Sequence, residues 1–107
     1  MTDKIVVLCT CSSAQEAETI ARRLVEARLA ACATILAGAR SIYRWEGQIQ
    51  DTAEAQLLIK SSRAMFEKLR AEIEKCHSYQ VPELLALTVV EGSENYLNWM
   101  DAELGHE

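Results

Sequence analysis

The chain has 107 residues, half of them hydrophobic, with one proline and four glycines, which is typical of one globular domain over residues 1–107. Its 16 acidic residues outnumber its 11 basic ones, for a net charge of −5, which excludes partners that demand a basic surface, such as nucleic acids and anionic membranes. No apolar stretch approaches the roughly 20 residues that a membrane-spanning helix needs.

The N-terminal part predicts a strand followed by a helix. Residues 4–11, KIVVLCTC, are rich in β-branched side chains and lack polar alternation until Thr10, which is typical of a central strand. In the next segment Ser13 and Glu16 form a capping-box pattern, in which each side chain is expected to satisfy a free backbone N–H group. The apolar stripe of this helix consists of Ala17, Ile20, Ala21, Leu24 and Val25.

Two extended segments then predict a long hairpin over about residues 32–61. A bulge or bend is expected at Ala37-Gly38, and the turn at EGQ, residues 46–48.

A second helix, a strand and a short final helix complete the chain. Ser62 is expected to cap the second helix, whose apolar stripe continues to Cys76. Pro82 favours an extended chain before it, and residues 83–92, ELLALTVVEG, predict the last strand. Ser93 then opens the final helix.

The order of elements is β-α-β-β-α-β plus one helix. With right-handed crossovers it predicts an α+β, ferredoxin-like antiparallel sheet of strand order 4-1-3-2, with both long helices on one face. The opposite face has no cover within one subunit. Because residues 5–8 and 84–90 are apolar on both faces of their strands, we expect an obligate homo-oligomer of two or three subunits.

Thiol and imidazole side chains are expected to converge at one edge of this sheet. The second helix ends where the first strand ends, which brings Cys76 and His77 to the same edge as Cys9 and Cys11. Such donors suit a soft or borderline ion, so the imidazole with two or three of these thiols predicts a site for Cu(I), Cu(II) or Zn(II). Thiols must lose protons to bind, so the affinity should fall in acid.

The same residues also permit a structural interpretation. Free cysteines often pack as small hydrophobic residues, and Cys76 continues the apolar stripe of its helix. His77 alone fits a helix C-terminus, where the helix dipole favours a positive charge.

Compartment and activity are predicted from absent signals. The apolar run 5–9 is too short for a signal peptide, so we expect a cytoplasmic protein with its four cysteines reduced. No glycine-rich loop or oxyanion motif accompanies the Cys and His residues, and we expect no enzymatic activity.

A second cluster lies in SIYRWEG, residues 41–47. Strand alternation puts Tyr43 and Trp45 on one face, where aromatics commonly serve packing or subunit contacts. The functional alternative is a small-molecule or signalling oligomer with inter-subunit clefts, by analogy with PII-type sensors. The residues expected to line these clefts are Tyr43, Trp45, Glu54, Lys60, Tyr79 and Glu83. An adaptor that presents its surface to a protein partner is a third possibility.

Three segments carry a resemblance to a known family. Residues 30–49 (AACATILAGARSIYRWEGQI), 57–62 (LLIKSS) and 77–99 (HSYQVPELLALTVVEGSENYLNW) resemble the CutA family of divalent-ion tolerance proteins. The likeness extends over nearly the whole chain. It implies a ferredoxin-like subunit in a tight homotrimer, and a cytoplasmic role in tolerance of copper and other divalent cations.

The resemblance also implies a copper site. The family's ligand positions match Cys9, Cys76 and His77, and metal-binding relatives tend to have histidine in place of Cys76. A thiol in that place keeps a ligand but shifts the preference towards softer ions.

Overall fold

A computed structural model describes residues 1–105 of the chain. Its first strand, β1 (Lys4–Cys11), occupies an inner position in the sheet. The prediction of one domain over residues 1–107 also includes residues 106–107, which lie outside the described part. The elements after β1 are α1 (Ala14–Glu26), β2 (Cys32–Trp45), β3 (Gln48–Ser62), a 3-10 turn (Arg63–Met65), α2 (Phe66–Cys76), β4 (Leu85–Thr88) and α3 (Glu94–Glu103).

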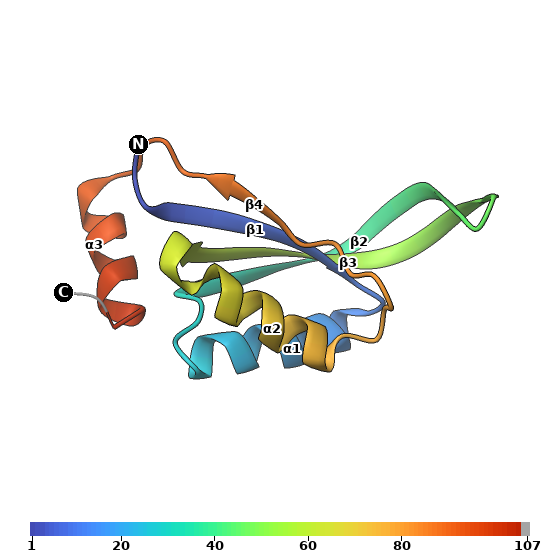
Figure 1. Ribbon diagram of the computed structural model, residues 1–107, viewed down its shortest axis with the longest axis horizontal. Coiled ribbons are helices and arrows are strands. Elements are labelled where there is room, and N and C mark those ends of the chain that lie inside the picture. Colours follow the sequence, from blue (N-terminus) through green and yellow to red (C-terminus); the bar gives the residue numbers. More distant parts are fainter. Residues whose placement is uncertain (106–107) are drawn as a thin grey trace.

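The four strands form one antiparallel sheet in the order β2-β3-β1-β4, which is the predicted 4-1-3-2 order counted from the other edge. Val7 of β1 lies opposite Ile59 of β3 on one side and Ala86 of β4 on the other. Figure 1 shows α1 and α2 together on one face of the sheet, with α3 at the end near the N-terminus. The ferredoxin-like α+β prediction is therefore confirmed.

The core fills the layer between this sheet face and the two helices. Strand alternation sends Ile5, Val7, Cys9 and Cys11 from β1 towards the helices, where each is at most 3 % exposed. The large aliphatic residues that pack with them are Leu57, Ile59, Ile20, Leu24, Leu69 and Ile73. Burying one such side chain contributes about 1.5–3 kcal/mol. This packing fixes the rotation of α2 and therefore where its C-terminal end lies.

The β2–β3 hairpin extends well beyond the helices (Figure 1), and the described chain measures 47 × 25 × 23 Å along its principal axes. The predicted bulge is confirmed, because the register shifts between Leu36 and Ala39 and Gly38 has a φ of 82°. At the tip, Glu46 and Gly47 both have positive φ, as the turn of a two-residue hairpin requires.

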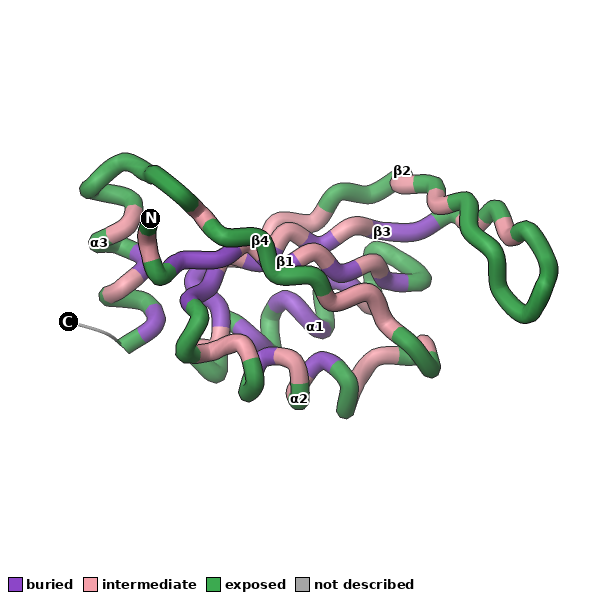
Figure 2. Tube along the Cα trace, turned by 45° about the horizontal axis from the view of Figure 1, so that its top comes forward, coloured by how far each residue is buried: buried purple, intermediate pink, exposed green. Residues whose placement is uncertain are grey.

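The other face of the sheet is apolar and uncovered in a single subunit. Val6 and Leu8 lie opposite Leu87 and Leu85 on this face, and Leu85 and Leu87 are 56 % and 51 % exposed. Figure 2 shows β4 as an exposed segment alongside the largely buried β1. The expected exposed apolar patch is thus present in the subunit.

Two element boundaries differ from the prediction. The last strand is shorter than residues 83–92, because regular pairing with β1 covers only Leu85–Thr88. The second helix does not begin at a Ser62 cap: this side chain is fully buried and makes no capping hydrogen bond, and a 3-10 turn precedes α2. Burial of Ser62 at the end of β3 withdraws its hydroxyl from the helix terminus.

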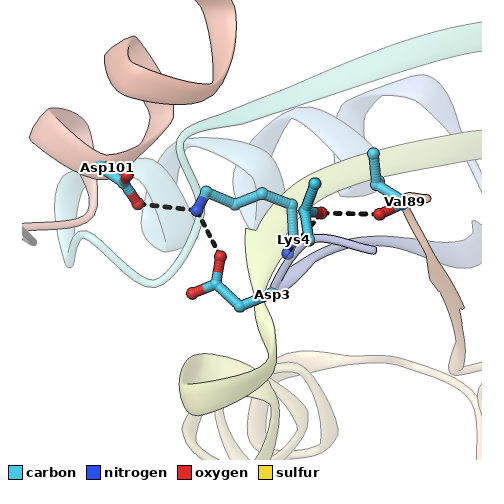
Figure 3. A network of polar contacts seen from close by, with 5 residues as sticks. Asp3, Lys4, Val89 and Asp101 are labelled. Atoms are coloured by element: carbon cyan, nitrogen blue, oxygen red, sulfur yellow. Dashed lines mark hydrogen bonds and ion pairs between the residues drawn. The ribbon is translucent and has the colours of Figure 1, made fainter. Parts of the chain in front are cut away.

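A buried ammonium group ties α3 to the sheet. The Lys4 side chain is 5 % exposed, and its Nζ lies 2.6 Å from Asp3 Oδ1 and 2.7 Å from Asp101 Oδ1 of α3 (Figure 3). Ala31, Met100 and Leu104 form a small apolar cluster in the same region. No helix within residues 1–105 is long and apolar enough to cross a membrane.

Candidate metal centre and adjoining cavity

The N-terminus of α1 is tied to the loop after α2 through Glu16. Its backbone N–H donates to Ser13 Oγ at 3.1 Å, which confirms half of the predicted capping box. The Glu16 carboxylate does not accept from Ser13, however, but from the N–H of Ser12 at 2.9 Å and from the N–H of Ser78 at 2.8 Å. Partial burial raises the pKa of Glu16, but these hydrogen bonds outweigh it and lower the pKa to about 2. Glu16 thereby fixes the residue that follows His77.

Glu16→Gln is expected to lower the free energy of unfolding by about 1–3 kcal/mol at neutral pH, because an ionised acceptor of two backbone N–H groups is lost. Since the folded-state pKa lies below the ordinary 4.5, the stability that Glu16 contributes is present above pH 4.5 and is lost as the pH falls towards 2. Urea unfolding at a fixed protein concentration measures this. The difference in the free energy of unfolding between wild type and variant should become smaller as the pH falls from 4.5 towards 2.

Glu18→Gln is the matched control, because Glu18 lies on the exposed side of α1 and pairs there with Arg22. Its expected effect is within about 0.5 kcal/mol. Equal effects of the two substitutions at neutral pH contradict the role assigned to Glu16.

Three candidate ligands meet at the end of β1. Cys9 and Cys11 are both 0 % exposed and project from the same face of the strand, and His77 directly follows α2. One donor atom from each residue lies within 4.8 Å of the other two. The predicted convergence of the helix end with the strand end is therefore observed, and it comprises Cys9, Cys11 and His77.

Cys76 does not join this group. Its thiol donates to the Glu72 carbonyl oxygen at 3.2 Å, within the last turn of α2, and its side chain packs against the core. This placement agrees with the structural interpretation of Cys76. Cys11 takes the third position instead, and the two-residue spacing of Cys9 and Cys11 was the sequence signal that pointed to it.

Both ring nitrogens of His77 are engaged. Nδ1 accepts the N–H of Tyr79 at 3.0 Å, so the proton of the neutral ring resides on Nε2, which donates to the Thr10 carbonyl oxygen at 2.8 Å. The rings of His77 and Tyr79 also pack with centroids 4.8 Å apart. An ion that binds at Nε2 takes the place of this proton and of the contact with Thr10.

The thiol of Cys9 is protonated at neutral pH. Its pKa is raised by the hydrogen bond with Cys11, by burial, and by the negative charges of Glu83 and Glu16. A metal ion at this site must displace thiol protons, so its affinity rises with pH.

The donor set fits a soft or borderline ion. Two thiols and an imidazole are the ligands that Cu(I) and Zn(II) prefer. Around one Zn(II), with Zn–S of about 2.3 Å, tetrahedral ligand atoms lie roughly 3.5–3.8 Å apart. The observed upper limit of 4.8 Å requires only a small contraction of the group.

A cavity of about 640 Å³ lies next to the Cys9, Cys11 and His77 group, on the open face of the sheet. Thr10 forms part of its wall, and its carbonyl oxygen accepts from His77. The other lining residues come from β2, from β3 and from the loop between α2 and β4. They are Ser41, Tyr43, Trp45, Glu54, Ser78, Tyr79, Gln80, Val81, Pro82 and Glu83.

Five of the six residues expected to line a cleft thus share one cavity, and Lys60 is not among them. The Lys60 ammonium group instead contacts Thr34 Oγ1 and lies 3.6 Å from Cys32 Sγ. Lys60 and Glu54 are six residues apart on β3, which is about 20 Å along an extended strand.

Comparison with known proteins agrees with the fold. The family model described as CutA1 divalent ion tolerance protein matches residues 5–103. The chain is 44 % identical over 102 residues to the divalent-cation tolerance protein CutA of Pectobacterium atrosepticum, covering 95 % of this chain and 93 % of that protein. It is 45 % identical over 100 residues to the Thermus thermophilus CutA protein, with 94 % and 97 % covered.

Solved structures give the same result. CutA from Xylella fastidiosa matches with a TM-score of 0.94 at 41 % identity, over 96 % of this chain and 99 % of that one. The Archaeoglobus fulgidus protein, described as a periplasmic divalent cation tolerance protein, matches with a TM-score of 0.92 at 34 % identity, over 94 % and 98 % of the two chains. The chain therefore belongs to the CutA1 divalent ion tolerance protein family.

Proposed function

We propose that this protein is a cytoplasmic, non-enzymatic homotrimer that binds copper, or a similar soft ion such as Zn(II), through Cys9, Cys11 and His77. Binding lowers the concentration of the free ion, which is a direct way to support metal tolerance. The observation that carries the proposal is the convergence of two thiols and one imidazole within 4.8 Å. The membership of a divalent ion tolerance family supports the choice of a metal as ligand.

The surroundings of the site favour a reduced, soft-ion centre. Cys9, Cys11, Cys32 and Cys76 are all free thiols, as a reducing compartment maintains them. Burial of Cys9 and Cys11 keeps water and large ligands away from the sulfur atoms. Glu16, through Ser78, and Thr10 hold the histidine segment in place, and such outer contacts commonly tune metal affinity by about 10–100-fold.

Self-assembly is supported by the open sheet face. Exposed Leu85 and Leu87 continue an apolar surface over β4 and β1, and a second copy of the chain would remove it from water. The projecting β2–β3 hairpin provides strand edges for pairing between subunits. We propose three subunits on the strength of the family resemblance.

Titration of the reduced protein with Cu(I), in competition with a chromophoric Cu(I) chelator, tests the ligand set. Cys9→Ser, Cys11→Ser and His77→Ala are each expected to weaken binding by at least about tenfold, because each removes a donor atom. The wild-type affinity should rise about tenfold per pH unit for each proton released. A parallel Zn(II) titration decides the order of preference between the two metals.

Cys76→Ser is the matched control, since it removes a thiol next to His77 that is bonded to Glu72 instead. It should leave the Cu(I) affinity unchanged within about twofold, well below the smallest loss expected for a ligand. The proposed ligand set is wrong if Cys76→Ser weakens binding as much as Cys11→Ser does.

A further inference from the structure

We infer that the cavity on the open sheet face binds a small organic cation, with an ammonium or guanidinium group attached to an apolar body. This second site is distinct from the thiol–imidazole group, because Cys9 and Cys11 face the helices whereas the cavity lies on the opposite face of the sheet. The inference does not depend on the metal-binding proposal.

Glu54 places a buried carboxylate in the wall of the cavity. Glu54 is 7 % exposed and belongs to the lining of the cavity. Its carboxylate accepts a hydrogen bond from the Tyr79 hydroxyl at 2.6 Å, and within residues 1–105 it forms no salt bridge. Ionised carboxylates are costly to bury without a cation, and one phenol satisfies only a part of their hydrogen-bonding capacity. A cationic ligand would supply the missing charge.

The cavity lining carries a net negative charge. Glu83 adds a second carboxylate, whose contact with Gln56 Nε2 is long, at 3.4 Å. No lysine, arginine or histidine is among the described lining residues. The negative potential of two carboxylates in a concave, partly apolar site attracts cations and repels phosphates and carboxylates. Nucleotides therefore fit this cavity poorly.

Aromatic rings form part of the cavity wall. Tyr43 and Trp45 project from the same face of β2 and are 41 % and 42 % exposed, while Tyr79 is held by its bond to Glu54. The negative faces of aromatic rings attract ammonium and guanidinium groups, and the rings also accept the apolar body of such a ligand. A hydrated inorganic cation gains little from these rings, which favours an organic one.

The cavity is large enough for a small organic molecule. A volume of about 640 Å³ lies within the range of about 300–1,000 Å³ that is usual for small-molecule sites. An aromatic amine such as benzylamine fills only part of this volume, so the natural ligand can be larger than benzylamine.

Calorimetric titration of the assembled protein with benzylamine, and separately with its neutral analogue benzyl alcohol, tests the inference. Benzylammonium is expected to bind at least about tenfold more tightly than benzyl alcohol, because only the cation pairs with buried carboxylate. Phenylacetate, which carries the opposite charge on a similar body, should show no binding.

Glu54→Gln and Glu83→Gln are each expected to weaken benzylammonium binding by about tenfold and to leave benzyl alcohol unchanged. Glu91→Gln, which removes an exposed carboxylate outside the cavity, is the matched control and should have no effect. If Glu54→Gln prevents folding, Glu83→Gln alone carries the test.

Two results overturn the inference. The first is equal binding of benzylamine and benzyl alcohol, or benzylamine binding that neither substitution changes, since the charge then plays no role. The second is an absence of benzylamine binding by the assembled wild-type protein, which means that a neighbouring subunit fills the cavity or neutralises Glu54. Neither result bears on Cu(I) binding by Cys9, Cys11 and His77.

Discussion

Leu87→Asp converts the assembled protein into folded monomers: this is the largest effect that we expect from a single substitution. In one subunit the side chain at position 87 is 51 % exposed, so an aspartate there remains hydrated and the subunit can still fold. In the proposed trimer we expect the same side chain to be buried against the apolar face of another subunit. An unpaired carboxylate in that setting costs several kcal/mol, which weakens each interface by about a hundredfold or more.

Sedimentation velocity at micromolar concentration measures the change, and far-ultraviolet circular dichroism verifies that the monomer is folded. Val25→Asp is the matched control, because Val25 is also a half-exposed apolar residue, at 42 %, but lies on α1 in the helix layer. It should leave the assembly intact. A wild-type protein that sediments as a stable monomer contradicts the proposal before any substitution is made.

The second large effect is expected from the double substitution Asp3→Asn/Asp101→Asn, which leaves the buried Lys4 ammonium without a carboxylate partner. Lys4 Nζ lies 2.6 Å and 2.7 Å from the two carboxylates (Figure 3), and its side chain is only 5 % exposed. Because Asp3 and Asp101 are 61 % and 36 % exposed, water screens these pairs, and the loss of both carboxylates is expected to cost about 1–3 kcal/mol. We expect that loss in the free energy of unfolding, measured by urea titration.

The dependence on pH gives a further check on the Lys4 pair. Burial lowers the pKa of Lys4, but the hydrogen bonds and charges of Asp101 and Asp3 outweigh it and raise the pKa above its ordinary 10.5. The stability that this pair contributes is therefore present below pH 10.5 and is lost as the pH rises through the higher folded-state value. The difference in the free energy of unfolding between wild type and double variant should therefore become smaller at alkaline pH.

Asp51→Asn is the control for this prediction, since Asp51 pairs with Arg40 on the exposed hairpin. Its effect on the free energy of unfolding should be much smaller than that of the double substitution, because exposed ion pairs contribute little. A double variant as mild as Asp51→Asn would mean that water reaches Lys4 readily when the carboxylates are gone.

The proposed metal site and the cavity adjoin each other, although they lie on opposite faces of the sheet. Alternation along β1 sends the side chains of Cys9 and Cys11 towards the helices, whereas Thr10 between them lines the cavity. The Thr10 carbonyl oxygen also accepts from the His77 ring. One residue of β1 thereby contacts both sites.

Several features could be predicted because they depend on local patterns. The strand, helix and hairpin signals gave the right order of elements, and the handedness of crossovers then left one sheet order. The bulge at Gly38 followed from a glycine inside a strand pattern. The meeting of the strand end with the helix end followed from topology alone.

The choice among the cysteines required the tertiary structure. Packing of Leu69 and Ile73 sets the rotation of α2, which keeps the Cys76 thiol against its own helix at Glu72. The chain leaves the helix at His77, with φ −83° and ψ 142°, and this change of direction brings the imidazole to β1. A one-residue difference in where a helix ends is beyond what periodicity resolves.

The sequence by itself determined the element order, the ferredoxin-like sheet, the apolar open face and the edge at which thiols and imidazole meet, because all four are periodic or topological properties of the chain. Only the tertiary structure decided that Cys11 rather than Cys76 joins Cys9 and His77, and that Glu54 but not Lys60 enters the cavity. These outcomes depend on strand register and helix rotation, which are set by close packing between segments that are far apart in the sequence.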